Sequence, residues 1–241
     1  MKKKTIGIIG GMGPWATADL YLKIVEYYQK NFGAKYDQDF PPFLIYSVPI
    51  PDVVESLENE KVTVKMLENA AKVLDRDGCD FILIACNTVQ YLINKIQNKI
   101  KIPIIGIGEI NARLIKKRRL KKVGILSTKL TLQKKIYERE FKKMGITLIK
   151  PNIFEREVIS RVIMNQLAGK VTDTDSKNLL KIIKRLKSKG AEAVLIACTD
   201  LPGVIKQANT SIPLIDCTQV YADYAGFLSS ASCPAKSKML L

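Results

Sequence analysis

Two cysteines of this chain stand at the same place in two copies of one phrase. Residues 81–89 read FILIACNTV and residues 193–201 read AVLIACTDL, so an apolar run ends at Cys86 in the first copy and at Cys198 in the second. A hydrogen-bonding side chain follows each cysteine. Because a thiol can donate a proton and a thiolate can accept one, a matched pair of thiols is suited to proton transfer on opposite sides of one ligand.

The composition excludes several other kinds of catalytic site. The chain has no histidine among its 241 residues, which rules out Cys-His and Ser-His catalysis and histidine metal sites. The five cysteines are an odd number with no CxxC pair, a pattern that disfavours a disulfide framework and a zinc site. Cys79 and Cys217 are typical of small buried hydrophobic residues, and Cys233 lies in a C-terminal segment of loose composition.

Internal similarity predicts the elements that position the two phrases. Three pairs of segments repeat at a nearly constant offset, and each begins with an apolar run: 5–14 with 122–131, 78–88 with 190–200, and 102–107 with 212–217. Such a repeat is the signature of a duplicated unit. Each apolar run is short enough to be a buried strand.

Helical patterns lie between these strands. Residues 59–77 place Val62, Met66, Ala70 and Val73 on one stripe. Residues 176–189 follow Thr/Asp-rich capping residues and repeat the stripe with Leu179, Ile182, Ile183 and Leu186.

Short apolar strands alternating with helices predict an α/β fold with mostly parallel sheets covered on both faces. We predict two similar Rossmann-like domains related by a pseudo-twofold axis, with the active site in the cleft between them. The first domain is expected to comprise residues 1–108 plus 217–241, and the second residues 109–216.

The predicted fold places both cysteines where ligands bind, because open parallel sheets bind ligands beyond the carboxyl ends of their strands. A thiol at a helix N-terminus is expected to have a lowered pKa. Two such groups on opposite faces of a carbon can invert a stereocentre, since one removes a proton while the other returns one. Donors must then stabilise the charge that develops on the substrate carboxylate. The candidate hydroxyl donors are Thr88, Thr128, Thr131 and Thr199.

Four motifs together resemble the aspartate/glutamate racemase family: GGMGP at 10–14, IPD at 50–52, ACNT at 85–88 and ACTD at 197–200. They occur in the family's order and cover most of the chain. The resemblance implies a cofactor-independent amino-acid racemase, without pyridoxal phosphate or metal, that forms a homodimer. It implies that Cys86 and Cys198 are the catalytic proton donor and acceptor. The substrate-binding residues that it implies are Met12, Gly13, Asn87, Thr88, Thr128 and Thr199.

Three positions depart from the pattern of the family's aspartate racemases. Val53 replaces an arginine, Leu167 replaces a lysine, and Asp200 replaces a glutamate. Because a desolvated carboxylate needs a charged partner, the two missing cations predict weaker binding of an acidic side chain. The nearby cations that could replace them are Lys129, Arg156 and Arg161.

Other functions are compatible with the same pattern. A hydantoin racemase, a decarboxylase or a cis-trans isomerase of the same broad superfamily would share one or both cysteines. A non-catalytic small-molecule binding protein would also have two α/β domains around a cleft. The segment GMGPWA at 11–16 fits a dinucleotide-binding loop, but Pro14 removes a backbone N–H that such a loop would use. A tight strand-to-helix turn is the preferred interpretation of this segment.

The net charge of +16 includes the run KKRRLKK at 116–122. Without interleaved aromatic residues or a binding motif, this run is typical of a solvated helix end rather than a nucleic-acid site. No apolar stretch reaches the ~18 residues of a membrane span, and the N-terminal apolar run is too short for a signal peptide. We expect a cytoplasmic protein with a small-molecule amino-acid substrate and no nucleic-acid or membrane partner.

Overall fold

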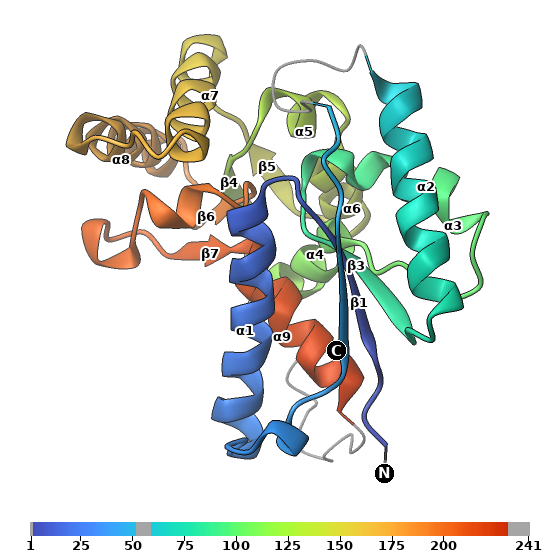
Figure 1. Cartoon of the computed structure of the whole chain (residues 1–241). Coiled ribbons are helices and arrows are strands. Elements are labelled where there is room, and N and C mark those ends of the chain that lie inside the picture. Colours follow the sequence, from blue (N-terminus) through green and yellow to red (C-terminus); the bar gives the residue numbers. More distant parts are fainter. Residues whose placement is uncertain (1, 52–58, 231–241) are drawn as a thin grey trace.

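The computed structural model describes residues 2–51 and 59–230. Asp52, Val53 and Cys233, which the sequence analysis considered, lie outside the described residues. Figure 1 shows two parallel sheets with helices around them. The predicted α/β fold of two similar units with parallel sheets is confirmed.

The first sheet has the strand order β2-β1-β3. Its strands are β1 (Ile6–Gly10), β2 (Phe43–Ser47) and β3 (Phe81–Ile84), and both pairings are parallel. The predicted strand at 102–107 is wrong except for one bridge between Ile82 and Ile104. A helix then begins at Ile107.

The second sheet has the order β5-β4-β6-β7, which repeats the order of the first sheet with one full strand added. Its strands are β4 (Lys122–Leu126), β5 (Thr147–Ile149), β6 (Ala193–Ile196) and β7 (Leu214–Asp216). β7 occupies the position of the Ile104 bridge, so the second copy of the unit completes the strand that the first copy only begins.

Helices and short 3₁₀ turns connect the strands. The α-helices are α1 (Pro14–Phe32), α2 (Glu60–Arg76), α3 (Ile93–Gln97), α4 (Ile107–Lys117), α5 (Lys129–Gln133), α6 (Ile136–Lys143), α7 (Ile153–Leu167), α8 (Asp173–Ser188) and α9 (Cys217–Ser229). The 3₁₀ turns are η1 (Asp37–Asp39), η2 (Thr88–Leu92), η3 (Leu201–Gly203) and η4 (Gln207–Asn209).

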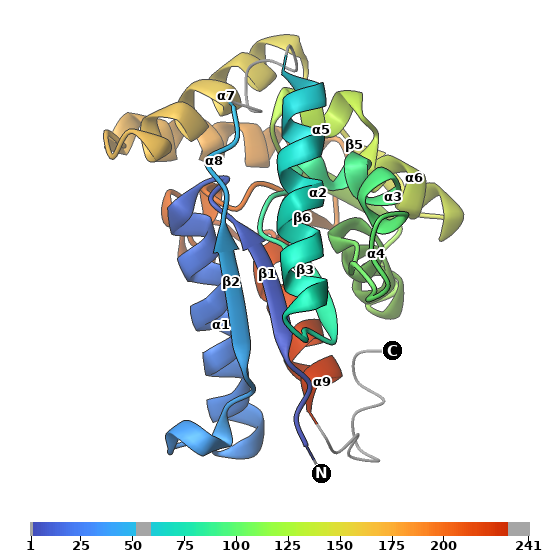
Figure 2. The ribbon, with the colours of Figure 1, turned by 45° about the vertical axis from the view of Figure 1, so that its right-hand side comes forward.

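The central strands of each sheet are covered on both faces, as their near-continuous apolar sequences require, whereas the edge strand β2 is partly exposed. In the first sheet, Ile8 packs with Leu20 of α1, whereas Ile9 packs in the cluster that contains Leu67 of α2. Figure 2 shows α1 and α2 on opposite sides of β1 and β2. In the second sheet, alternate side chains pack against α7 and α8 on one face and join the central core on the other.

The two long helical patterns differ in how well the sequence predicted their buried faces. All four predicted residues of α8 are buried, and Thr172 caps its N-terminus with Asp175 in a capping box. In α2 the prediction is correct for Ala70, which is fully buried, but Val62 is half exposed, and Thr63 and Leu67 are buried in place of Val62 and Met66.

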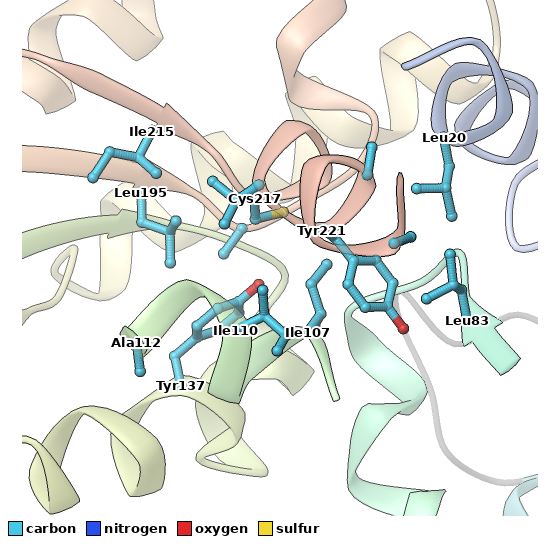
Figure 3. Packing of buried hydrophobic residues seen from close by; sticks show 14 of the residues in the cluster. Leu20, Leu83, Ile107, Ile110, Ala112, Tyr137, Leu195, Ile215, Cys217 and Tyr221 are labelled. Carbon is cyan, nitrogen blue, oxygen red and sulfur yellow. The ribbon is translucent and has the colours of Figure 1, made fainter. Parts of the chain in front are cut away.

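One hydrophobic cluster joins the two units. It contains residues of α1, β1 and β3 from the first unit and of α4, α6, β4 and β6 from the second, with α9 between them. Figure 3 shows Cys217 and Tyr221 of α9 among Leu83, Ile110 and Leu195. The ends of β3 and β6 are therefore held relative to one another by a continuous core.

The turn after β1 matches the preferred interpretation of the sequence. Pro14 occupies the first turn of α1, and Gly11 has a left-handed φ of 92° because it lies against the backbone of Val48. The basic run at 116–122 is exposed between the end of α4 and the start of β4, as expected for a helix end. Within the described residues, none of the helices combines the length and apolar character needed to cross a membrane.

The packing of α9 on α1 leads to a test of stability. A Cβ at Gly226 would lie 2.8 Å from Cγ and Cε1 of the buried Tyr27 ring. Gly226→Ala should gain about 1 kcal/mol of helix propensity but lose more from the clash with a ring that cannot rotate away. We expect a net destabilisation of about 1–3 kcal/mol in urea-induced unfolding. Gly106→Ala, at a position with open space, is the control and should change stability by less than about 1 kcal/mol. A stabilised Gly226→Ala variant would contradict this packing.

Candidate active site

The carboxyl ends of β3 and β6 meet at a small cavity. Cys86 follows β3 by two residues and Cys198 follows β6 by two residues, and both side chains line this cavity. The cavity has a volume of about 20 Å³, close to the space that one water molecule occupies. The lining residues are Met12, Cys86, Asn87, Thr88, Thr128, Cys198, Thr199 and Asp200.

A chain of hydroxyl groups crosses from one unit to the other at the cavity. Thr88 Oγ1 lies 3.1 Å from Thr128 Oγ1, which lies 2.9 Å from Thr131 Oγ1. Thr128 also caps α5, because its side chain accepts a hydrogen bond from the backbone N–H of Thr131. The cap fixes the position of the Thr128 hydroxyl that contacts Thr88.

The structure brings together seven of the nine residues that the sequence predicted for this site, all of which line the cavity. Thr131 is fully buried one hydrogen bond behind the lining, on Thr128. Gly13 lies at the edge of the site, where a Cβ would approach Leu167 Cδ2 to 3.3 Å. Leu167 at the end of α7 therefore lies against the loop that carries Met12 and Gly13.

Burial dominates the electrostatics of both thiols. The expectation of lowered thiol pKa values is wrong: desolvation raises the pKa of Cys86 and raises that of Cys198 well above its ordinary value. Backbone N–H groups of Thr88 and Val89 act in the opposite direction at Cys86, but burial outweighs them. The cysteines precede short 3₁₀ turns rather than long helices, so little helix dipole is available to offset the burial.

Asp200 makes the two thiols unequal. Its carboxylate lies near Cys198, whose Sγ is 3.8 Å from Asp200 Oδ2, and its negative charge adds to the rise in the pKa of Cys198. Burial in turn raises the pKa of Asp200. Cys86 is therefore the thiol that ionises more readily, and Cys198 is the weaker acid, which keeps its proton at rest and is the stronger base once ionised.

The cations that the sequence offered as partners for an acidic substrate are engaged elsewhere. Lys129 forms an ion pair with Glu157 at 2.6 Å, and Arg156 donates to the carbonyl of Pro151 at 2.9 Å. The charge of Arg161 acts on Asp175. Among the described residues that line the cavity there is no lysine or arginine, and Asp200 contributes a carboxylate.

Sequence reasoning missed the side chains that support the cavity from behind. Gln90 donates to the carbonyls of Ile84 and Cys86 at 3.2 and 3.1 Å, and so fixes the loop after β3. Asn87 makes hydrogen bonds with Tyr137 and Cys217, two fully buried residues. No sequence signal distinguishes these residues, since Tyr137 belongs to an amphipathic helix and Cys217 stands in an apolar run.

Most of the chain is similar to known proteins. The family model of Asp/Glu/hydantoin racemases matches residues 9–225. The broad specificity amino-acid racemase RacX of Bacillus subtilis is 31% identical over 216 residues, which are 88% of this chain and 92% of RacX.

The chain is also similar to solved structures of racemases and their homologues. An aspartate racemase homologue from Pyrococcus horikoshii superposes with a TM-score of 0.80 at 32% identity, covering 94% of this chain and 99% of that one. The aspartate racemase of Picrophilus torridus gives a TM-score of 0.77 at 28% identity, covering 92% and 94%. The chain therefore belongs to the Asp/Glu/hydantoin racemase family, as the sequence motifs predicted.

Proposed function

We propose that this protein racemises amino acids without a cofactor, using Cys86 and Cys198 as the two bases. The observation that carries the proposal is that both thiols, from equivalent strand ends of two units, line one cavity. A thiolate on one side takes the α-proton and becomes a thiol, while the opposite thiol gives its proton to the other face and becomes a thiolate. The reverse reaction exchanges these roles.

The polar lining supplies the remaining part of this mechanism. Removal of the α-proton places negative charge on the substrate carboxylate, and donors fixed in a water-excluded site stabilise that charge most effectively. Asn87, Thr88 and Thr128 are buried and line the cavity, so we assign them to the carboxylate. Burial raises the pKa of each thiol, which brings a thiolate closer in basicity to the weakly acidic α-carbon.

The substrate that fits this lining is an amino acid without an acidic side chain. Asp200 would repel a second carboxylate, Lys129 and Arg156 already have other partners, and neither they nor Arg161 line the cavity. Leu167, which lies beside Gly13, adds an apolar surface in place of a cation. The printed name of RacX, a broad specificity racemase, is consistent with such a site.

Substrate entry requires the site to open, because about 20 Å³ is far smaller than the 300 Å³ or more of typical ligand pockets. We propose that the units formed by residues 1–108 plus 217–241 and by 109–216 separate to admit the substrate. The proposal includes the homodimeric state that the family resemblance implies and the cytoplasmic location expected from the sequence.

Single replacement of either thiol tests the two-base mechanism. Cys86→Ser and Cys198→Ser should each lower racemisation by about 10²–10⁴-fold, because an alcohol is a poor acid and base at neutral pH. Each variant should retain exchange of the α-proton of one enantiomer with deuterated water, measured by NMR. Cys79→Ser, which alters a buried thiol outside the cavity, is the matched control and should keep full activity. Racemisation that survives in both site variants would rule out the mechanism.

The charge of Asp200 predicts a pH dependence. Because burial raises both thiol pKa values, the thiolate population and kcat/KM should rise with pH in the native enzyme. Asp200→Asn removes the negative charge beside Cys198, so the pKa of Cys198 should fall. The rise of kcat/KM with pH should then occur at lower pH than in the native enzyme. Asp223→Asn, at a partly buried carboxyl outside the cavity lining, should leave the profile unchanged. A rise of kcat/KM that occurs at higher pH in Asp200→Asn would contradict this electrostatic role.

Leu167 provides a test of specificity. Leu167→Lys should raise kcat/KM for aspartate relative to alanine by about tenfold, because a partly desolvated ion pair replaces an apolar contact. Leu167→Gln introduces a polar side chain without the charge. It should leave the ratio of kcat/KM for aspartate to that for alanine within about twofold of the native ratio. The two substrates can compete in one sample, with α-proton exchange followed by NMR. A native enzyme that already prefers aspartate strongly would refute the assignment of a non-acidic substrate.

A further inference from the structure

Three buried side chains form a polar cluster directly behind the cavity: Asn87, Tyr137 and Cys217. The Tyr137 hydroxyl donates to Asn87 Oδ1, and Asn87 Nδ2 donates to Cys217 Sγ at 3.4 Å. Tyr137 is the second residue of α6 and Cys217 is the first residue of α9, so both units contribute. Figure 3 shows Tyr137 and Cys217 in the same packed cluster.

The hydrogen-bond partners of the Asn87 carboxamide fix its orientation. Oδ1 has two lone pairs, one facing the Tyr137 hydroxyl and the other 3.8 Å from the Cys217 thiol. Nδ2 has two hydrogens, and within the described residues the structure gives it one acceptor, Cys217 Sγ. The capacity left on this cavity-lining side chain is therefore one N–H donor.

The partners of Asn87 keep this orientation over the working pH range. Burial raises the pKa of Tyr137 well above its ordinary value and raises the pKa of Cys217 to about 12. Both groups therefore remain protonated near neutral pH. A protonated Tyr137 donates to Oδ1, whereas a phenolate would attract Nδ2 and turn the amide over.

The Tyr137 side chain is also well held. Its ring is 1% exposed and makes an edge contact with Phe141 at 5.9 Å between centroids. A carboxamide flip would leave the Tyr137 hydroxyl, fixed by this packing, facing an amide N–H instead of a carbonyl oxygen.

We propose that Tyr137 is a positioning residue that holds the Asn87 amide oxygen away from the ligand and so presents Asn87 Nδ2–H to the substrate α-carboxylate. This inference rests on the proposed function, since it assigns a role within that same site. Asn87 acts on the substrate directly, and Tyr137 acts through Asn87. Cys217, a thiol that takes no part in proton transfer, completes the anchor of the amide.

A double-mutant cycle tests the proposal. In the native background, Tyr137→Phe keeps the ring, frees the amide and should weaken amino-acid binding by about tenfold, the loss expected for a hydrogen bond to a charged group. In the Asn87→Ala background, the same change should alter binding by less than about twofold, because the residue through which Tyr137 acts is absent. Tyr28→Phe removes another buried tyrosine hydroxyl, which is bonded to Ser229, and is the control for a purely structural loss.

Two readouts separate this proposal from the proposed function. Dissociation constants for alanine, measured by calorimetry, need no turnover, while α-proton exchange reports the reaction itself. Native protein that binds alanine without exchanging its α-proton would end the racemase proposal and still decide the role of Tyr137. An equal loss of affinity from Tyr137→Phe in both backgrounds, or no loss in either, would overturn the positioning role. Native protein that fails to bind any amino acid would overturn both.

A measurement on the unmutated chain covers the case in which Tyr137→Phe fails to fold. The side-chain NH₂ signals of Asn87, assigned by their loss in Asn87→Ala, should shift when alanine is added. They should not shift when ethylamine is added, because ethylamine lacks the carboxylate. Equal shifts with both ligands would show that Nδ2–H does not face the carboxylate.

Discussion

The proposed stereoinversion requires Cys86 and Cys198, which follow β3 and β6, to lie on opposite sides of one substrate carbon atom. Parallel strands in the same order in both sheets place Cys86 and Cys198 at equivalent positions. The shared hydrophobic cluster, with α9 between the units, sets the distance between those positions. The contact between the Thr88 and Thr128 hydroxyls then joins the two units at the cavity. Disturbing any of these contacts would separate the two thiols that, in the proposed mechanism, act on the same carbon atom.

Closure of the site has opposing effects on its chemistry. Burial makes each thiolate harder to form, and the charge of Asp200 adds to that cost at Cys198. The same burial strengthens every hydrogen bond to the substrate carboxylate and makes a formed thiolate a stronger base. Backbone N–H groups favour ionisation of both thiols, those of Thr88 and Val89 at Cys86 and that of Asp200 at Cys198, whereas the charge of Asp200 is a larger contribution at Cys198 than at Cys86. The duplication supplies the geometry, and the local polar residues supply the difference in proton affinity.

The parts of the structure that follow from a repeated pattern could be predicted from the sequence. The strands before both cysteines, the parallel sheets of two similar units and the buried face of α8 follow from repeated local patterns, and they were predicted correctly. The strand predicted at 102–107 is reduced to a single bridge at Ile104, although the next helix begins at the position equivalent to the start of α9 after β7, so the same local pattern forms a full strand in one copy only. The thiol pKa values depend on how tightly two distant segments close, which no local pattern encodes. Tyr137 illustrates the same point, because its partner Asn87 is 50 residues away in the other unit.

The most direct measurement is the isotopic content of each enantiomer at early times in deuterated water. If separate thiols serve the two faces of the α-carbon, an L-amino acid should give D-product that carries deuterium while the remaining L-substrate keeps its protium. Chiral chromatography with mass spectrometry measures both species in one sample. D-product that retains the original proton, or L-substrate that gains deuterium as fast as product forms, would mean that one group serves both faces and would contradict the two-thiol account.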